Sequence, residues 1–219
     1  MKGIGHLTWL VFGSLVGFAV PFIFSDLLSL PRDLYYLIYF AAIFAFLGLY
    51  ARRTGLNVKD WFSRRLVWGL VLGLIFGALV ARFILTTPAT PKLSGAALAW
   101  ALFWRGACYG AVDGLLMSVF PWTVTWRAFR AEEKPLGRKI AVGIVAWIFI
   151  LVVTAAYHVG YRDYRSKALM KPVIGNTMNS LPTLLAANPA GAPLAHAIMH
   201  LAVVLHAPGS DVYLPPHGD

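Results

Sequence analysis

The residues best suited to chemistry are a carboxylate and several imidazoles in apolar surroundings. Asp113 lies in residues 103–121, FWRGACYGAVDGLLMSVFP, and it is the only acidic residue inside a strongly apolar span. His196 and His200 are four residues apart, which places both imidazoles on one face of a helix. A charged side chain within a membrane span costs about 2.5–3.5 kcal/mol on insertion scales, so such residues are functional candidates by default.

Two kinds of chemistry suit these side chains. The histidine pair could ligate a divalent metal such as Zn²⁺ together with His158, with Asp113 as a further ligand, and a metal-bound water would then attack a polar bond. Without a metal, the same groups could act as the general base and oxyanion donors of an intramembrane hydrolase. Such side chains also hydrogen-bond neighbouring helices with no further role. The candidate catalytic residues are Asp113, His158, His196, His200 and Arg105; Asn176 and Asn179 are candidate substrate-binding residues.

The composition places the chain in the membrane. Of its 219 residues, 59% are hydrophobic and only 13% are charged, which leaves too little polar surface for a water-soluble domain. The net charge of +10 does not indicate a nucleic-acid partner, because the basic residues form short clusters between apolar runs. The single cysteine, Cys108, excludes an internal disulfide framework.

Five stretches approach or exceed the roughly 20 residues that a membrane helix needs. They cover residues 6–24, 34–50, 66–85, 95–120 and 140–161, the first as an uncleaved span and the fourth ended by Pro121. Three tyrosines at the start of the second span fit an interfacial belt: Tyr35, Tyr36 and Tyr39.

The last third of the chain has a different pattern. Proline, glycine and asparagine interrupt its apolar runs, so residues 169–206 predict two short or re-entrant helices that form a hairpin against the bundle. Two full, tilted spans are the alternative. The predicted fold is an all-α integral membrane protein with about five transmembrane helices plus this broken hairpin. Residues 1–206 form one polytopic membrane domain, and residues 207–219 form an extended tail.

Glycine recurs every fourth residue in three spans. The first span contains a pair, Gly13 and Gly17, and the third and fourth spans contain triplets, Gly69, Gly73 and Gly77, and Gly106, Gly110 and Gly114. Such stripes let helix backbones approach closely, so these three spans are expected to pack tightly.

The basic clusters predict the orientation in the membrane. The loops after the second and fourth spans, residues 52–65 and 127–139, are rich in arginine and lysine. They should be cytoplasmic, which places the N-terminus with Lys2 on the cytoplasmic side of a multi-pass protein of the cell membrane. Residues 162–171 are also basic, although parity places them outside. Either the parity is wrong, or these residues bind anionic ligands or lipid headgroups.

Three motifs resemble the CPBP family, the CAAX-protease and bacteriocin-processing intramembrane proteins. That family shows a Glu-Glu-x-x-x-Arg motif, then Phe-x-x-x-His, then His-x-x-x-Asn/Asp, each on a membrane helix. Arg105 resembles the end of the first motif, His158 the histidine of the second, and His196-x-x-x-His200 the third. The resemblance covers about residues 95–206 and implies an intramembrane peptidase.

The chain departs from that family's pattern at several positions. Trp100 and Ala101 stand where the family has its two glutamates, and Thr154 stands in place of the phenylalanine. His200 replaces the last Asn/Asp, which leaves Asp113 as the one available carboxylate. The leading hypothesis is therefore a divergent CPBP-like intramembrane hydrolase, active or degenerate, that acts on a membrane-embedded peptide or lipid-like substrate.

Two other functions are alternatives. A non-enzymatic membrane subunit or scaffold would use the glycine stripes to bind partner helices. A small transporter would use discontinuous helices near residues 172–193 as its ligand site, with Asn176 and Asn179 lining the path.

Overall fold

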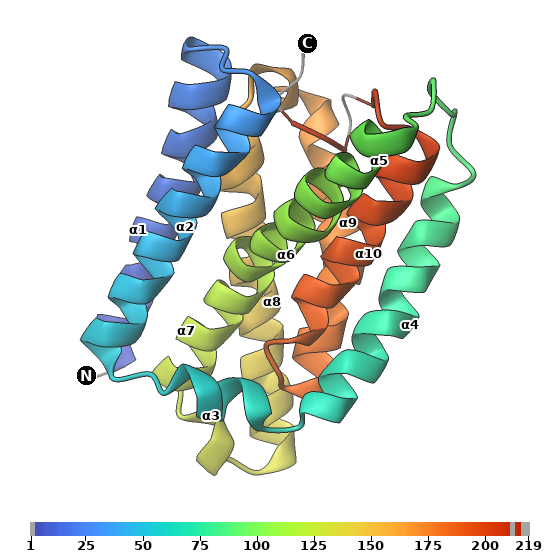
Figure 1. Cartoon of the computed structure of the whole chain (residues 1–219). Coiled ribbons are helices and arrows are strands. Elements are labelled where there is room, and N and C mark those ends of the chain that lie inside the picture. Colours follow the sequence, from blue (N-terminus) through green and yellow to red (C-terminus); the bar gives the residue numbers. More distant parts are fainter. Residues whose placement is uncertain (1–2, 211–212, 216–219) are drawn as a thin grey trace.

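The computed structural model describes residues 3–210 and 213–215. All of the regular secondary structure assigned within these residues is helical (Figure 1). Four continuous helical segments are long and apolar enough to cross a membrane. They are α1 (Gly3–Val20) with its π-helical extension η1 (Pro21–Leu27), α2 (Arg32–Thr54), α4 (Leu66–Ile84) and α8 (Leu136–Val159). These helices confirm four of the predicted spans, and the chain is an all-α multi-pass membrane protein.

The predicted fourth span is a longer helical run that contains two π-helical segments. It consists of α5 (Gly95–Ala101), η2 (Leu102–Cys108), α6 (Tyr109–Gly114), η3 (Leu115–Val119) and α7 (Phe120–Ala128). In Figure 1 this run, in green, crosses the middle of the bundle obliquely. The expectation that Pro121 ends the span is wrong. Helix α7 follows η3 without a break, and the wider π-helical turn before Pro121 accommodates the proline, so the helix continues to Ala128.

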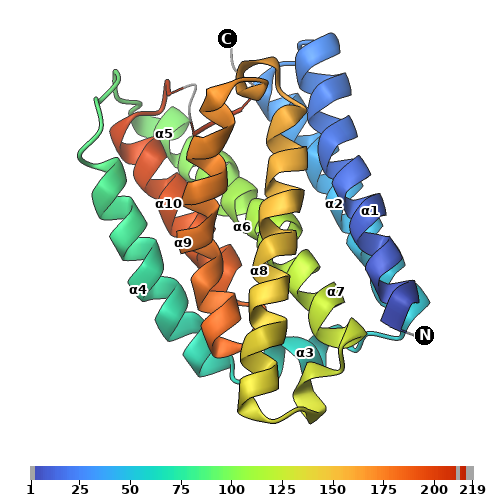
Figure 2. The ribbon, with the colours of Figure 1, turned by 180° about the vertical axis from the view of Figure 1, so that it is seen from behind.

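The last third forms the expected hairpin, but its helices are not broken. Helix α9 (Met170–Ala186) and helix α10 (Gly191–His206) are joined by residues 187–190. Pro172 lies in the first turn of α9, where its N–H has no intrahelical partner to lose, and the helix continues through Gly175 to Pro182. The predicted interruption is thus confined to the connection between the helices, as Figure 2 shows from behind.

The two glycine triplets pack on α10 rather than on each other. A Cβ added to a glycine of α4 would meet the turn before α10 or α10 itself, at Asn188, Gly191, Leu194, Ala195 and Ile198. A Cβ added to Gly106, Gly110 or Gly114 would meet the opposite side of α10, at Leu201, Ala197 and Pro193. Helix α10 is therefore clamped between two glycine stripes (Figure 1). In α1, Gly13 packs against Phe120 at the start of α7. This contact agrees with the prediction that the first and fourth spans pack closely.

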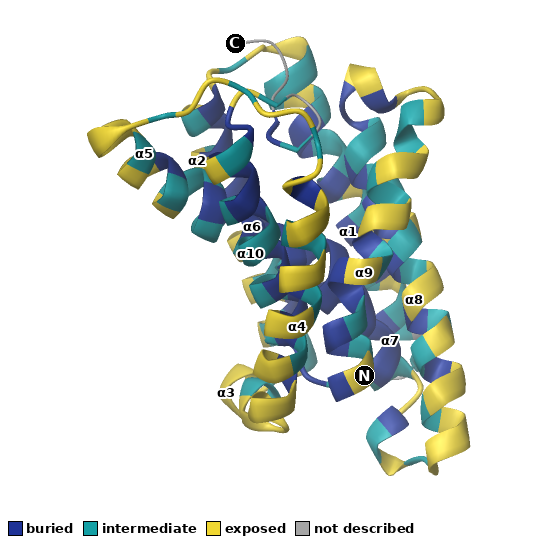
Figure 3. Cartoon of the chain, turned by 90° about the vertical axis from the view of Figure 1, so that its right-hand side faces the viewer, coloured by how far each residue is buried: buried dark blue, intermediate teal, exposed yellow. Residues whose placement is uncertain are grey.

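The outer surfaces of the bundle are apolar. Large hydrophobic side chains are exposed on α4 and α8, among them Trp68, Leu74, Ile144 and Ile148. Figure 3 shows the exposed outer faces of α4 and α8 in yellow and the buried α6 in dark blue. Such surfaces suit contact with the lipid bilayer.

The basic loop at residues 162–171 has partners within the chain. Arg162 and Arg165 form ion pairs with Asp26 at 3.3 and 2.9 Å, at the end of η1. This loop therefore lies at the end of the bundle opposite the short helix α3 (Val58–Ser63) (Figure 1). The parity of the spans is retained, and local ion pairing accounts for part of the positive charge. Lys2 lies outside the described residues, and the cytoplasmic side of the N-terminus remains a prediction.

The described part of the tail covers one end of the bundle. Residues 207–210 and 213–215 form no regular helix, and Leu214 is fully buried. It packs in a cluster with Ile84 of α4 and Ala101 of α5. The tail therefore adds to the core of the membrane domain instead of forming one of its own.

Candidate active site

Asp113 lies in α6, between the two π-helical segments, and is only 3% exposed. The hydroxyl of Tyr39 on α2 donates a hydrogen bond of 2.8 Å to Oδ1 of Asp113. The other oxygen, Oδ2, is 3.6 Å from Nε2 of His200 on α10, which is too long for a hydrogen bond. One carboxylate oxygen of Asp113 therefore accepts a hydrogen bond, and the other faces the imidazole of His200 from beyond hydrogen-bond distance.

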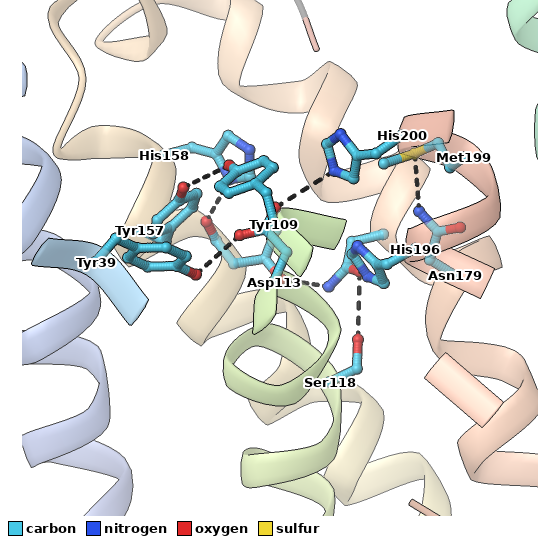
Figure 4. A network of polar contacts seen from close by, with 12 residues as sticks. Tyr39, Tyr109, Asp113, Ser118, Tyr157, His158, Asn179, His196, Met199 and His200 are labelled. Carbon is cyan, nitrogen blue, oxygen red and sulfur yellow. Dashed lines mark hydrogen bonds and ion pairs between the residues drawn. The ribbon is translucent and has the colours of Figure 1, made fainter. Parts of the chain in front are cut away.

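Two of the three histidines of α10, His196 and His200, meet Asp113, as Figure 4 shows. One nitrogen of His196, one nitrogen of His200 and one oxygen of Asp113 all lie within 4.8 Å of one another. Both histidines are 2% exposed. The structure thus brings together three of the predicted site residues, from helices that are far apart in the sequence.

Asn176 on α9 fixes the orientation of His196. Its Oδ1 lies 2.8 Å from Nε2 of His196, and its Nδ2 donates to Oγ1 of Thr154. Thr154 in turn donates its own proton to the carbonyl of Ile150, so its hydroxyl oxygen is the acceptor for Asn176. The amide oxygen of Asn176 therefore accepts from His196, which places the proton on Nε2 and leaves a lone pair on Nδ1.

Four buried polar atoms around this site have no hydrogen-bond partner among the described residues. They are Nδ1 of His196, Nδ1 and Nε2 of His200, and Oδ1 of Asn179. A buried polar atom without a partner costs about 1–3 kcal/mol, and folded proteins contain few of them. Several in one place indicate a site that is built to hold water, an ion or a substrate.

A cavity of about 790 Å³ opens onto these atoms. Its polar lining includes Asp113, Asn176, Asn179, His196 and His200. Much of the remaining wall is apolar or aromatic, including Val80, Phe83, Ile84, Tyr109, Met117, Tyr157, Met170, Ile174 and Met199. The polar atoms therefore face a space large enough for a small substrate.

His158 and Arg105 are placed differently from the other candidates. His158 lines the same cavity, but its Nδ1 donates to the carbonyl of Thr154 at 2.8 Å, and it is not a member of the three-residue group. Arg105 is not among the cavity-lining residues; its Nε donates to Oδ1 of Asp33 at 2.9 Å. The predicted catalytic role of Arg105 gains no support, because the ion pair ties its side chain to the first turn of α2.

Sequence reasoning missed the tyrosines around the site. Tyr35, Tyr36 and Tyr39, predicted as an interfacial belt, are fully buried. Four tyrosine hydroxyls form a continuous chain with O–O distances of 2.5–2.7 Å, in the order Tyr35, Tyr161, Tyr157 and Tyr109. The available signal was the i, i+4 spacing of two pairs, 35/39 and 157/161, which marks an aromatic face turned towards neighbouring helices.

The fold and the site together define a class: a multi-pass helical membrane protein with a buried carboxylate and two imidazoles facing a cavity. Comparison of the chain with protein-family models, curated proteins and solved structures gives no match. The resemblance to the CPBP family therefore rests on the motifs alone.

Proposed function

We propose that the protein is an intramembrane hydrolase in which Asp113 activates a water molecule. The observation that carries this proposal is the position of Oδ2 of Asp113, which faces Nε2 of His200 at 3.6 Å on the wall of the cavity. A carboxylate oxygen at this distance from an imidazole leaves room for a water molecule between them and can receive a proton from it. The unpaired nitrogens beside it can hold that water in place.

The chemistry follows from these positions. A water molecule between Asp113 and His200 gives a proton to Oδ2 while its oxygen attacks a carbonyl carbon of the substrate. The bond from that carbon to the leaving group then breaks, and Asp113 returns the proton to the leaving group. His200 can donate an N–H to the carbonyl oxygen as negative charge develops on it.

The walls of the cavity suggest the substrate class. Phe83 on α4 and Met170 and Ile174 on α9 line the cavity and are also 63%, 56% and 62% exposed, respectively. In a bilayer these side chains would meet lipid, so an apolar chain could pass beside them into the cavity. We therefore infer that the substrate is a membrane-embedded peptide or acyl lipid, in which a peptide, ester or amide bond is cleaved.

The motif resemblance supports a divergent member of the CPBP family. His158, His196 and His200 face one cavity in the order that the family's motifs predict. Trp100 is 48% exposed and donates to Asp33, while Ala101 packs in an apolar cluster with Ile84. The positions of the family's two glutamates are not among the residues that line the cavity, and in this proposal the role of the carboxylate falls to Asp113.

The two alternative functions have less support. The glycine triplets are already covered by α10, so they offer no free face to a partner helix. A transporter would need its ligand site at a helix break near residues 172–193, whereas the interruption in this range is the connection at residues 187–190, which does not line the cavity. The asparagines line the cavity, as a transporter requires, but they lie beside a reactive carboxylate.

Isotope incorporation tests the proposal directly. The purified protein in lipid nanodiscs is incubated in H₂¹⁸O with a panel of transmembrane peptides and acyl lipids. We expect at least one member to be cleaved, with one ¹⁸O atom in the new carboxyl group, which mass spectrometry detects. Absence of cleavage across peptide, ester and amide members would contradict the proposal.

Removing the hydroxyl of Tyr39 tests the positioning of Asp113. Tyr39→Phe should lower the hydrolytic rate by roughly 10- to 150-fold, because a hydrogen bond to a charged group contributes about 1.5–3 kcal/mol. Tyr36→Phe is the matched control, since Tyr36 is equally buried on the same helix and its hydroxyl has no hydrogen-bond partner among the described residues. Equal rates for the two variants would show that the bond to Asp113 does not affect the reaction.

A further inference from the structure

We propose that Asp113, His196 and His200 bind a divalent metal ion of the zinc class, through Oδ2, Nδ1 and Nε2 respectively. The inference rests on the proposed function and changes the role of Asp113 in it, because a carboxylate that ligates the ion would activate the water through the metal instead of taking up its proton directly. Its test is a binding measurement that does not depend on catalysis. The sequence predicted His158 as the third ligand, whereas the geometry assigns that place to Asp113.

The distances fit three ligands of one ion. Ligand atoms about 2.0–2.1 Å from a tetrahedral ion lie roughly 3.4 Å from one another. Oδ2 of Asp113 and Nε2 of His200 are 3.6 Å apart, too far to bond directly and close to that spacing. One imidazole nitrogen of each histidine and one oxygen of Asp113 lie within 4.8 Å of one another. Small side-chain rotations would therefore complete the coordination.

The unpaired nitrogens are independent evidence for a ligand. His200 has no hydrogen-bond partner on either ring nitrogen among the described residues, and His196 has none on Nδ1, although both side chains are almost fully buried. These are the lone-pair donors that a metal requires. Ordered water could satisfy them instead, and the experiment separates the two cases.

Two of the three proposed ligands, His196 and Asp113, have a supporting hydrogen bond on the atom that does not face the ion, whereas Nδ1 of His200 has none among the described residues. Nε2–H of His196 donates to Asn176, which leaves Nδ1 as the ligand atom. Oδ1 of Asp113 accepts from Tyr39, which leaves Oδ2. Metal-binding histidines and carboxylates usually have such supporting hydrogen bonds, which fix the tautomer and the orientation of each ligand.

The donor set selects the class of metal. Two imidazoles and one carboxylate suit Zn²⁺, and Fe²⁺ uses the same donors, whereas Mg²⁺ and Ca²⁺ prefer oxygen ligands. Three protein ligands leave a fourth position for water beside the cavity, which is the arrangement of catalytic zinc sites. A metal in this place would favour deprotonation of that water at neutral pH.

Metal binding to the full-length protein tests the inference. Protein freed of metal by a chelator is titrated with Co²⁺, whose absorption reports tetrahedral coordination, and then with Zn²⁺ or Fe²⁺ under anaerobic conditions as competitor. We expect one equivalent of Co²⁺ to bind and to be displaced by Zn²⁺. Displacement by Fe²⁺ but not by Zn²⁺, or no tetrahedral spectrum, would overturn the assignment to the zinc class.

Variants locate the ion. His196→Gln, His200→Gln and Asp113→Asn should each weaken Co²⁺ binding at least 100-fold, and Asn176→Leu should weaken it roughly 10- to 100-fold through the lost support of His196. His206→Gln is the matched control, since His206 is on the same helix and bonds to the carbonyl of Thr87. His158→Gln should retain one equivalent. Loss of binding in His158→Gln but not in Asp113→Asn would overturn the proposed ligand set.

A thermal shift of the wild-type protein provides a second test if a ligand variant does not fold. Zn²⁺ added after chelation should raise the Tm of the wild-type protein. An unchanged Tm and no Co²⁺ binding would show that the site holds water only.

Two further outcomes keep this inference separate from the proposed function. Hydrolysis that persists at full rate in chelator would refute the metal but retain Asp113 as the base. Metal binding without hydrolysis would refute the hydrolase and retain the metal site.

Discussion

Replacing Asp113 with asparagine is expected to lower the hydrolytic rate by about 10²- to 10⁴-fold without unfolding the protein. Asparagine has the same size, and its carbonyl oxygen can still accept the hydrogen bond of Tyr39. It has no negative charge and cannot take up the proton of the attacking water. The loss should therefore appear in kcat, because the walls of the cavity that bind the substrate are unchanged.

The control for this variant is a second aspartate on a membrane helix. Asp33→Asn makes the same chemical change at the start of α2, where Asp33 pairs with Arg105 and does not line the cavity. A partly exposed ion pair contributes about 0–1 kcal/mol, so Asp33→Asn should keep nearly full activity. Rates are measured with the substrate that the isotope experiment identifies. Equal losses in both variants would show that Asp113 is not the catalytic carboxylate.

Replacing Gly110 with alanine should destabilise the protein by about 1–3 kcal/mol and disturb the site. A Cβ at this position would lie 2.7 Å from the carbonyl oxygen of His196 and 2.7 Å from Cα of Ala197. Both are backbone atoms of α10, so no side chain can rotate away and the helix itself must move. Because His196 and His200 are on that helix, the proposed ligand geometry should be lost with it.

The matched control is Gly143→Ala in α8. A Cβ at Gly143 meets nothing within 4 Å, so the same substitution should change stability by less than about 1 kcal/mol. Thermal unfolding in one detergent compares the two variants, and Co²⁺ binding reports the geometry of the site. If Gly110→Ala kept both the Tm and the affinity of the wild type, the clamping of α10 by the glycine stripes would have no part in building the site.

These two substitutions concern one structural relation. Asp113 lies on α6 one turn after Gly110, and His196 lies on the part of α10 that Gly110 contacts. The close approach that the missing side chain permits is therefore what brings the carboxylate and the imidazoles within reach. On the other side of α10, Gly73 and Gly77 of α4 hold the helix in place.

The sequence determined the class of the protein and the residues with chemical potential. The spans were predictable because apolar length is a local property: about 20 apolar residues suffice to cross a bilayer. The i, i+4 spacing of His196 and His200 likewise fixed their common face, since helix geometry requires it. The glycine stripes predicted close packing, again from a repeat along one helix.

The tertiary structure alone decided what those faces meet. Both glycine triplets contact α10, which no pattern within a single span could reveal. Tyr39 bonds to Asp113 across 74 residues of sequence, and its aromatic neighbourhood was mistaken for an interfacial belt. Arg105 donates a hydrogen bond to Asp33, which is 72 residues away in the sequence. Contacts between distant segments depend on how whole helices pack, so hydropathy and local spacing cannot specify them.

The same distinction holds for the individual atoms of the site. That Nδ1 of His196 is free depends on Asn176, Thr154 and Ile150, which lie on two other helices. That Asp113, and not His158, completes the group depends on the oblique path of α6 through the centre of the bundle (Figures 1 and 4). The sequence supplied the carboxylate and the imidazoles. The packing of α10 between two glycine stripes brought them together, because only there could the backbones come close enough.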